Sequence, residues 1–99
     1  MHINFSIILP CFNESENIFE LYNEILDLDV RDYFFEIIFV NNGSFDNTSK
    51  KIDEIIEKSS KIKDIRFILR KINLPTNLGY GGGILEGLRK AKGDFIGWT

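Results

Sequence analysis

The chain has 99 residues, of which 43% are hydrophobic and 27% charged, and its net charge is -3. These proportions are typical of one globular domain, or one lobe of a larger one, and they exclude a disordered chain. The acidic balance disfavours a nucleic-acid partner, because binding to phosphate backbones usually requires a basic face. No apolar run approaches the roughly 20 residues of a membrane helix, so no membrane segment is expected within this sequence.

Cysteine usage and the first residues indicate the compartment. Cys11 is the only cysteine, so no intrachain disulfide can form and a reducing environment is expected. The first residues also lack the basic and apolar regions of a signal peptide. We therefore expect a cytoplasmic protein, held at the cytoplasmic face of a membrane if regions outside this chain anchor it there.

The first half of the chain predicts two strands and the helix between them. Residues 3–9 form a mostly apolar run that ends at Pro10 and predicts a buried strand. Apolar side chains at helical spacing then predict a helix from about Ser15 to Asp27, capped by Ser15 or Asn13. Residues 35–40, which are β-branched and aromatic, predict the second strand.

The second half repeats this alternation. Asp46 is expected to cap a helix with a buried stripe at Ile52, Ile55 and Ile56, and residues 65–69 predict a third, shorter strand. Residues 79–83 begin a third helix, and residues 95–98 begin a fourth strand. The side chains expected to point inward from this last helix are Ile84, Leu85, Leu88 and Ala91.

The alternation of strands and helices predicts an α/β fold. It should be a Rossmann-like, mostly parallel sheet of about four strands with helices on both faces. In such a sheet the ligand site lies at the carboxyl ends of the strands, and Thr99 stands where a loop of that site should follow the fourth strand. We therefore expect residues 1–99 to be the N-terminal part of a larger, truncated domain. The fourth strand should then be an exposed edge that favours self-association through Phe95, Ile96 and Trp98.

The loop after the first strand, Pro10-Cys11-Phe12-Asn13-Glu14, offers side chains rather than a bare backbone. It contains no glycine, so it is not the turn that cradles a dinucleotide pyrophosphate. Phe12 can stack on a nucleobase, or it can pack under the sheet edge. Glu14 can contact a ligand, or it can complement the dipole of the following helix.

The later loops are rich in short polar residues and glycine. The amide of Asn42 can pair with the edge of a base, whereas turn formation and helix capping are the alternatives for residues 41–48 and are favoured for Asp46. The glycines at 79–83 can bind an anion at a helix start, or they can allow close packing of helix on sheet. Ile84 breaks the G-x-G-x-x-G pattern, and no P-loop motif is present.

Residues for covalent or metal chemistry are missing from the sequence. Cys11 has only His2 as a histidine companion, so a buried small side chain is the better interpretation of this cysteine. Clustered Cys, His or carboxylate residues of the kind that hold a metal are not evident either. We therefore assign no catalytic and no metal-binding residue within the chain.

Four segments taken in order resemble family 2 glycosyltransferases. Residues 6–18 are similar to the family's first strand, which ends in Pro-x-aromatic-Asn-Glu, and residues 36–48 resemble its Val-Asp-Asp-Gly-Ser-x-Asp-x-Thr segment. Residues 77–83 and the turn Ala91-Lys92-Gly93-Asp94 resemble the stretches that precede the family's Asp-x-Asp metal motif. The form Tyr80-Gly81-Gly82 is similar to polyprenyl-phosphate glycosyltransferases in particular.

The resemblance implies an inverting enzyme of the GT-A fold. Such an enzyme takes a nucleotide-diphosphate sugar and a divalent metal, Mg²⁺ or Mn²⁺, and glycosylates a lipid-phosphate or glycan acceptor in cell-envelope polysaccharide synthesis. Its metal motif and catalytic base would follow Thr99, so this chain alone should be inactive. The substrate-binding residues implied here are Pro10, Phe12, Asn13, Glu14, Asn42, Ser44, Gly79 and Gly82.

One departure from the family pattern bears on the donor. Asn41 and Asn42 replace an acidic pair, and an amide can meet the donor and the acceptor of uracil together, whereas a carboxylate only accepts. This favours a UDP-sugar over a GDP-sugar. Two alternatives stay open, namely a non-catalytic nucleotide-binding module and another nucleotide-cofactor α/β domain of flavodoxin-like type.

Overall fold

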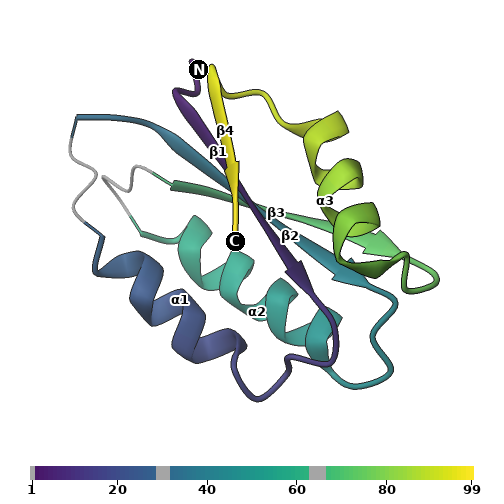
Figure 1. Cartoon of the computed structure of the whole chain (residues 1–99). Coiled ribbons are helices and arrows are strands. Elements are labelled where there is room, and N and C mark those ends of the chain that lie inside the picture. Colours follow the sequence, from purple (N-terminus) through teal and green to yellow (C-terminus); the bar gives the residue numbers. More distant parts are fainter. Residues whose placement is uncertain (1, 29–31, 63–66) are drawn as a thin grey trace.

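The structure is a computed structural model that describes residues 2–28, 32–62 and 67–99. Strands and helices alternate along the chain, as Figure 1 shows. The strands pair in parallel in the order β3-β2-β1-β4, which confirms the predicted α/β fold. The elements are β1 (Phe5–Cys11), α1 (Ile18–Leu26), β2 (Phe35–Asn42), α2 (Thr48–Ser60), β3 (Phe67–Leu74), α3 (Gly79–Lys90) and β4 (Phe95–Trp98).

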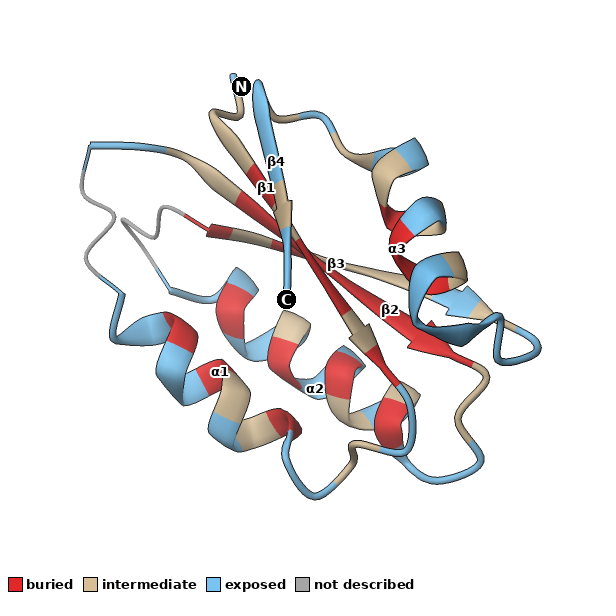
Figure 2. Ribbon diagram, viewed as in Figure 1, coloured by how far each residue is buried: buried red, intermediate tan, exposed pale blue. Residues whose placement is uncertain are grey.

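The helices cover both faces of the sheet, as expected. Helices α1 and α2 lie on one face and α3 lies on the other (Figure 1). The larger core packs α1 and α2 against the sheet around the fully buried Phe39, Ile52 and Ile55. The smaller core joins Ile8, Ile38 and Val40 to the α3 side. Figure 2 shows the buried residues on the central strands and on the helix faces turned toward them.

The first and third strands differ from the predicted ranges. Strand β1 extends through Pro10 to Cys11. Strand β4 pairs with β1 only as far as Ile8, so the missing N–H of Pro10 does not interrupt the hydrogen bonds between these two strands. Strand β3 continues to Leu74 across Arg70 and Lys71. Both charges are paired within the fold, Arg70 with Glu36 and Lys71 with Asp53. Residues 65 and 66, where the third strand was predicted to begin, lie outside the described residues.

Two predictions about the helices are wrong. Helix α1 begins at Ile18, and neither Ser15 nor Asn13 caps it; Asn17 holds the cap position without a side-chain hydrogen bond. Leu85 is exposed rather than inward, since it lies one residue, or about 100°, from the buried Ile84. The inward positions of α3 include two glycines, Gly83 and Gly87.

Strand β4 is an edge of the described sheet, as predicted. Phe95, Ile96 and Trp98 are all exposed on it. Association through this edge stays a prediction. None of the helices in the described ranges has the length and apolar character needed to cross a bilayer.

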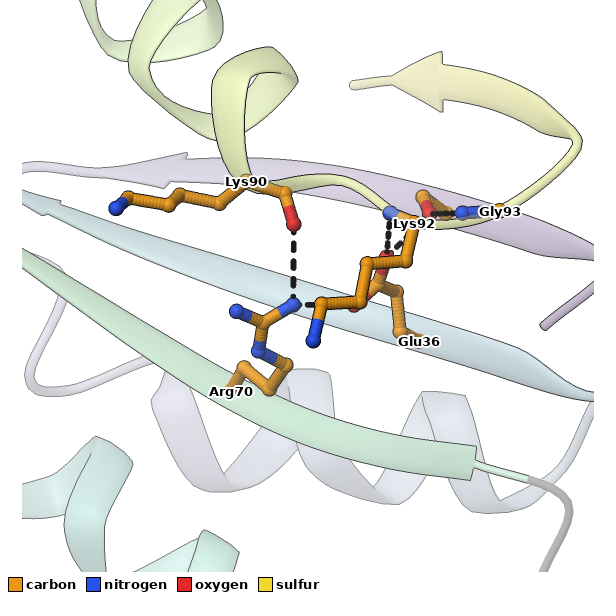
Figure 3. A network of polar contacts seen from close by, with 6 residues as sticks. Glu36, Arg70, Lys90, Lys92 and Gly93 are labelled. Atoms are coloured by element: carbon orange, nitrogen blue, oxygen red, sulfur yellow. Dashed lines mark hydrogen bonds and ion pairs between the residues drawn. The ribbon is translucent and has the colours of Figure 1, made fainter. Parts of the chain in front are cut away.

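A buried carboxylate was not recognised in the sequence. Glu36 is 0% exposed and precedes four apolar residues of β2. It accepts hydrogen bonds from the Ser6 hydroxyl (2.6 Å), from the Arg70 guanidinium (2.6 Å) and from the backbone amide of Lys92. The same arginine donates to the carbonyl of Lys90 at the last turn of α3 (3.1 Å). Figure 3 shows this network tying β1, β2 and β3 to the end of α3.

The turn after α3 requires a glycine at position 93, because the chain there lies close to β1. The amide of Gly93 donates to the Ser6 hydroxyl (2.8 Å). A Cβ at Gly93 would lie 2.7 Å from the backbone of Phe5 and Ser6. The Ala91-Lys92-Gly93-Asp94 turn is therefore part of the fold, because it joins α3 to the buried carboxylate and starts β4 beside β1.

Acid should weaken the fold through Glu36. Burial by itself raises the pKa of this carboxyl, but the bonds from Ser6, Lys92 and Arg70 outweigh burial and lower the pKa below its ordinary 4.5. A carboxyl with a lowered folded pKa stabilises fully above its unfolded value and loses that contribution as the pH falls through the folded one. We expect the free energy of unfolding, measured with urea, to decrease as the pH is lowered below 4.5.

The matched variant isolates this carboxyl from all others. Glu36→Gln should lower the free energy of unfolding at pH 7 by about 2 kcal/mol, because a charge-assisted bond network is lost. It should also make the acid dependence shallower than that of the parent chain. Equal slopes for parent and variant would show that Glu36 does not carry the effect.

Helix α3 packs so closely that a methyl group at Gly87 should be destabilising. A Cβ there would lie 2.4 Å from Cγ2 of the fully buried Ile8. Overpacking of this kind costs about 1–3 kcal/mol, more than the roughly 1 kcal/mol that alanine contributes to helix propensity. We expect Gly87→Ala to lower the free energy of unfolding in urea titrations.

Gly81 in the same helix provides the control, because its Cβ would meet nothing within 4 Å. Gly81→Ala should therefore stabilise the chain or leave it unchanged. The double variant Gly87→Ala with Ile8→Ala should lose less stability than the two single effects added together. If the free-energy losses of the two single variants simply add in the double variant, the close contact between Gly87 and Ile8 is contradicted.

Candidate functional site

The strand order places a crevice at the carboxyl edge of the sheet. The chain runs outward from β1 through β2 to β3 and then crosses to β4, which pairs with the other side of β1. In open parallel sheets ligands bind where the strand order reverses, outside the carboxyl ends. The end of β1 and its following loop are therefore the expected place for a site.

A cavity of about 440 Å³ occupies this place. Its volume lies within the range of small-ligand sites. The loop after β1, the end of β2 and the loop between β3 and α3 all contribute to it. The lining residues are Pro10, Cys11, Phe12, Glu14, Asn42, Asn77, Gly79 and Tyr80.

A smaller cavity of about 240 Å³ lies beside it on the α1 side. It shares Pro10, Cys11 and Glu14 with the first cavity and extends to Thr99. The loop after β1 therefore separates two hollows at the same edge of the sheet.

Most of the predicted binding residues lie together. Pro10, Phe12, Glu14, Asn42 and Gly79 line the larger cavity. Asn13, Ser44 and Gly82 are not among its lining residues, and whether any of these side chains binds a ligand stays a prediction.

Asn13 and Ser44 join the first two loops instead. The amide of Asn13 donates to the Ser44 hydroxyl (3.0 Å), and the Asn13 side-chain oxygen accepts from the amide of Phe45 (2.8 Å). Asn13 has a φ of 51°, a conformation that asparagine adopts more readily than most residues. The pair of bonds fixes the position of Phe12 and Glu14 on either side of Asn13.

Asp46 adds a second link between the same loops. Its carboxylate accepts from the hydroxyl and the amide of Thr48 at the start of α2, and also from the amide of Ser15 (3.2 Å). The Thr48 hydroxyl, foremost among these donors, lowers the pKa of Asp46 to about 2. Asp46 thus accepts from the first amide of α2 as a capping residue would, but Asn47 rather than Asp46 holds the cap position. The bond to Ser15 was not foreseen.

Phe12 presents an aromatic surface to the cavity. Its side chain is 39% exposed, so it is not packed under the sheet edge. The ring meets Phe45 edge to face, with centroids 6.0 Å apart. A base can stack on such a ring because aromatic faces attract one another in offset arrangements.

Glu14 is held by its own loop and by α2. Its carboxylate accepts from the Asn17 side chain (2.8 Å), and its amide donates to the Thr48 hydroxyl (2.9 Å). The residue stands just before α1 and also lines both cavities. Its position thus suits both interpretations given to it, a ligand contact and a partner of the helix dipole.

Asn42 makes contacts that sequence reasoning did not foresee. Its side-chain oxygen accepts from the amide of Leu78 (2.9 Å), and its side-chain nitrogen donates to the carbonyl of Gly79 (2.9 Å). The residue is 3% exposed. The adjacent Gly43 has a φ of 72°, and a Cβ there would lie 2.4 Å from the amide nitrogen of Asn77. The end of β2 therefore holds the loop that precedes α3.

Gly82, Gly83 and Gly87 of α3 lie close to neighbouring side chains, which supports the packing alternative for these three, whereas a Cβ at Gly79 or Gly81 would meet nothing within 4 Å. A Cβ at Gly83 would lie 3.0 Å from the side-chain nitrogen of Asn42, and one at Gly82 would lie 2.6 Å from Leu78. Gly83 and Gly87 thus allow α3 to approach the sheet closely.

Three lining residues were not among the predicted set, namely Cys11, Asn77 and Tyr80. All three lie within segments that resemble the family pattern, and this signal could have identified them from the sequence. Cys11 is 3% exposed, which confirms the interpretation of this residue as a small buried side chain, and its burial raises the pKa of the thiol to about 12. A thiol of such pKa is not a nucleophile at neutral pH.

Nothing in the described part of the chain resembles a metal centre. No three Cys, His, Asp or Glu side chains come together in residues 2–28, 32–62 and 67–99. Among these residues Glu14 is the one carboxylate that lines the larger cavity.

Comparison with known proteins places the chain in a family. The sequence pattern described as "Glycosyl transferase family 2" matches residues 6–99. The chain is 33% identical over 91 residues to poly-beta-1,6-N-acetyl-D-glucosamine synthase of Staphylococcus epidermidis, a match that covers 92% of this chain and 20% of that protein.

Solved structures agree with this match. TarS of S. aureus (residues 1–349) in complex with UDP-GlcNAc is 29% identical, with a TM-score of 0.74, and the match covers 98% of this chain and 26% of that one. The mannosyltransferase PcManGT of Pyrobaculum calidifontis, in complex with GDP-Man and Mn²⁺, is 22% identical with a TM-score of 0.79, covering 97% and 26%, and shows the fold alone. The chain thus spans about a fifth to a quarter of these proteins.

Proposed function

The chain belongs to glycosyl transferase family 2, and we propose that it forms the donor-nucleotide half of a sugar-nucleotide-dependent glycosyltransferase. The observation that carries the proposal is the cavity of about 440 Å³ at the reversal of the strand order. It combines an exposed aromatic ring, a carboxylate and the start of a helix. These groups suit the base, the ribose hydroxyls and the diphosphate of a donor, respectively.

We propose a uridine-linked donor. TarS, which is 29% identical to this chain, is known in complex with UDP-GlcNAc. Stacking on Phe12 is tolerant of base identity, so this ring supports nucleotide binding rather than the choice of base. The acceptor is proposed to be a lipid-phosphate or a glycan, as in the synthesis of surface polysaccharides.

The described residues do not form a complete site for the divalent metal expected in the intact enzyme. A single carboxylate at the cavity, Glu14, falls short of the several oxygen ligands that Mg²⁺ or Mn²⁺ takes. A bound metal would supply positive charge for the leaving diphosphate. The ligands for that role are proposed to lie outside this chain.

A binding module without chemistry remains the second candidate. The observation in its favour is that the described residues include neither a metal cluster nor a reactive thiol. The two candidates share the nucleotide cavity, so they differ in the residues beyond this chain rather than in what the chain binds.

UDP should bind in the larger cavity of the 99-residue chain. Titration followed by two-dimensional NMR should shift the amide signals of Phe12, Asn77 and Tyr80 together. Phe12→Ala should weaken binding about tenfold or more, because stacking on one aromatic ring is worth about 1–3 kcal/mol.

Phe95→Ala is the matched control, since this ring is also exposed but lies on the β4 edge. It should leave the dissociation constant for UDP unchanged. Shifts confined to β4, or equal losses in the two variants, would contradict the proposed site.

The 99-residue chain alone should release no UDP from UDP-GlcNAc, because the described residues form no metal site to neutralise the charge that develops on the leaving diphosphate. A coupled assay for free UDP, run with Mn²⁺ and again with a chelator, measures this directly. Release of UDP above background that is abolished by Phe12→Ala would contradict the expected inactivity.

A further inference from the structure

We infer that Asn42 shapes the nucleotide cavity by holding the loop before α3, and that it acts as a positioning residue rather than as a reader of the base. The inference rests on the function proposed above and assigns this side chain a different role within the same site. Its evidence is the pair of bonds from the Asn42 amide to the backbone of Leu78 and Gly79.

The two backbone partners determine the orientation of the amide. The N–H of Leu78 can only donate, so it must face the side-chain oxygen, and the carbonyl of Gly79 can only accept, so it must face the side-chain nitrogen. Both bonds are 2.9 Å long. Asparagine fits this site because it has one donor and one acceptor on the same planar group.

Burial leaves the amide little access to a ligand. Asn42 is 3% exposed, and Gly83 packs so closely that a Cβ there would lie 3.0 Å from the Asn42 nitrogen. The residue lines the cavity next to Gly79 and Tyr80. A substitution at Asn42 is therefore expected to alter the cavity by releasing the loop before α3, which this side chain holds.

An aspartate at position 42 could not hold this loop at neutral pH. A carboxylate accepts from Leu78 as the amide does, but it has no donor for the Gly79 carbonyl and would place a charged oxygen against that carbonyl oxygen. Gly79 has a φ of 78°, so the loop has a conformation that few other residues could keep. Loss of the second bond should let residues 77–80 move.

The test is Asn42→Asp in the 99-residue chain. The amide NMR signals of Leu78 to Tyr80 should shift strongly, and UDP and GDP should both bind about tenfold more weakly, so that the ratio of their dissociation constants stays constant. A residue that reads the base would instead change this ratio while the loop signals stay in place.

Asn41→Asp is the matched control. It makes the same chemical change one residue earlier, on the opposite face of β2, where the amide donates to the Asn73 side chain (3.0 Å). This variant should leave the signals of residues 78–80 close to those of the parent chain, because the Asn41 side chain bonds to Asn73 and not to the loop before α3.

Lower pH should rescue the variant, an effect that plain destabilisation would not produce. A protonated carboxyl has both a donor and an acceptor, so Asn42→Asp should regain the parent's loop signals and nucleotide binding as the pH is lowered. The other titratable groups at this cavity are Cys11 from β1, Glu14 from its loop and Tyr80 from α3. The parent chain has the same three groups, so its own titration corrects for them.

The possible results separate the two proposals. Unmoved loop signals in Asn42→Asp, a changed UDP-to-GDP ratio, or the absence of rescue would overturn the role given to Asn42. Failure of the parent chain to bind either nucleotide would overturn the proposed function instead, and the loop signals with their pH dependence would still decide whether Asn42 holds the loop.

Discussion

Helix α3 is held at both ends by polar side chains of one strand, and the site depends on this arrangement. Glu36 and Asn42 lie on the same face of β2, with the apolar Ile38 and Val40 between them. Six residues of strand rise about 20 Å, and the 12 residues of α3 extend about 18 Å. The strand thus presents a bonding group to each end of the helix and an apolar surface to its middle.

The two ends of this arrangement do different work. At the amino end of the strand, the Glu36 network joins α3 to the start of β4. The buried carboxylate accepts hydrogen bonds from Ser6, Arg70 and Lys92, and these bonds offset the cost of burying its charge. At the carboxyl end, the neutral amide of Asn42 holds the loop that lines the cavity. A second charge is not needed there, since both of its partners are backbone groups.

The sequence predicted the fold more completely than it predicted the site. Apolar periodicity identified every strand and helix, and motif order identified the family, because both depend on local residue spacing. Leu85 and the charged half of β3 were misjudged, since exposure of one helix position and pairing of Arg70 or Lys71 depend on distant segments. The same limit hid the role of Glu36, whose partners come from positions 6, 70 and 92, and the loop contacts of Asn42.

Amide hydrogen exchange in the 99-residue chain tests the central claim most directly, namely that β2 holds both ends of α3. The backbone amides of Leu78, Lys92 and Gly93 lie outside the helix, yet each donates to a side chain that is buried in the sheet. The account predicts that all three exchange slowly, at rates close to those of the central strand amides. Exchange of these amides as fast as that of exposed loop residues would contradict it.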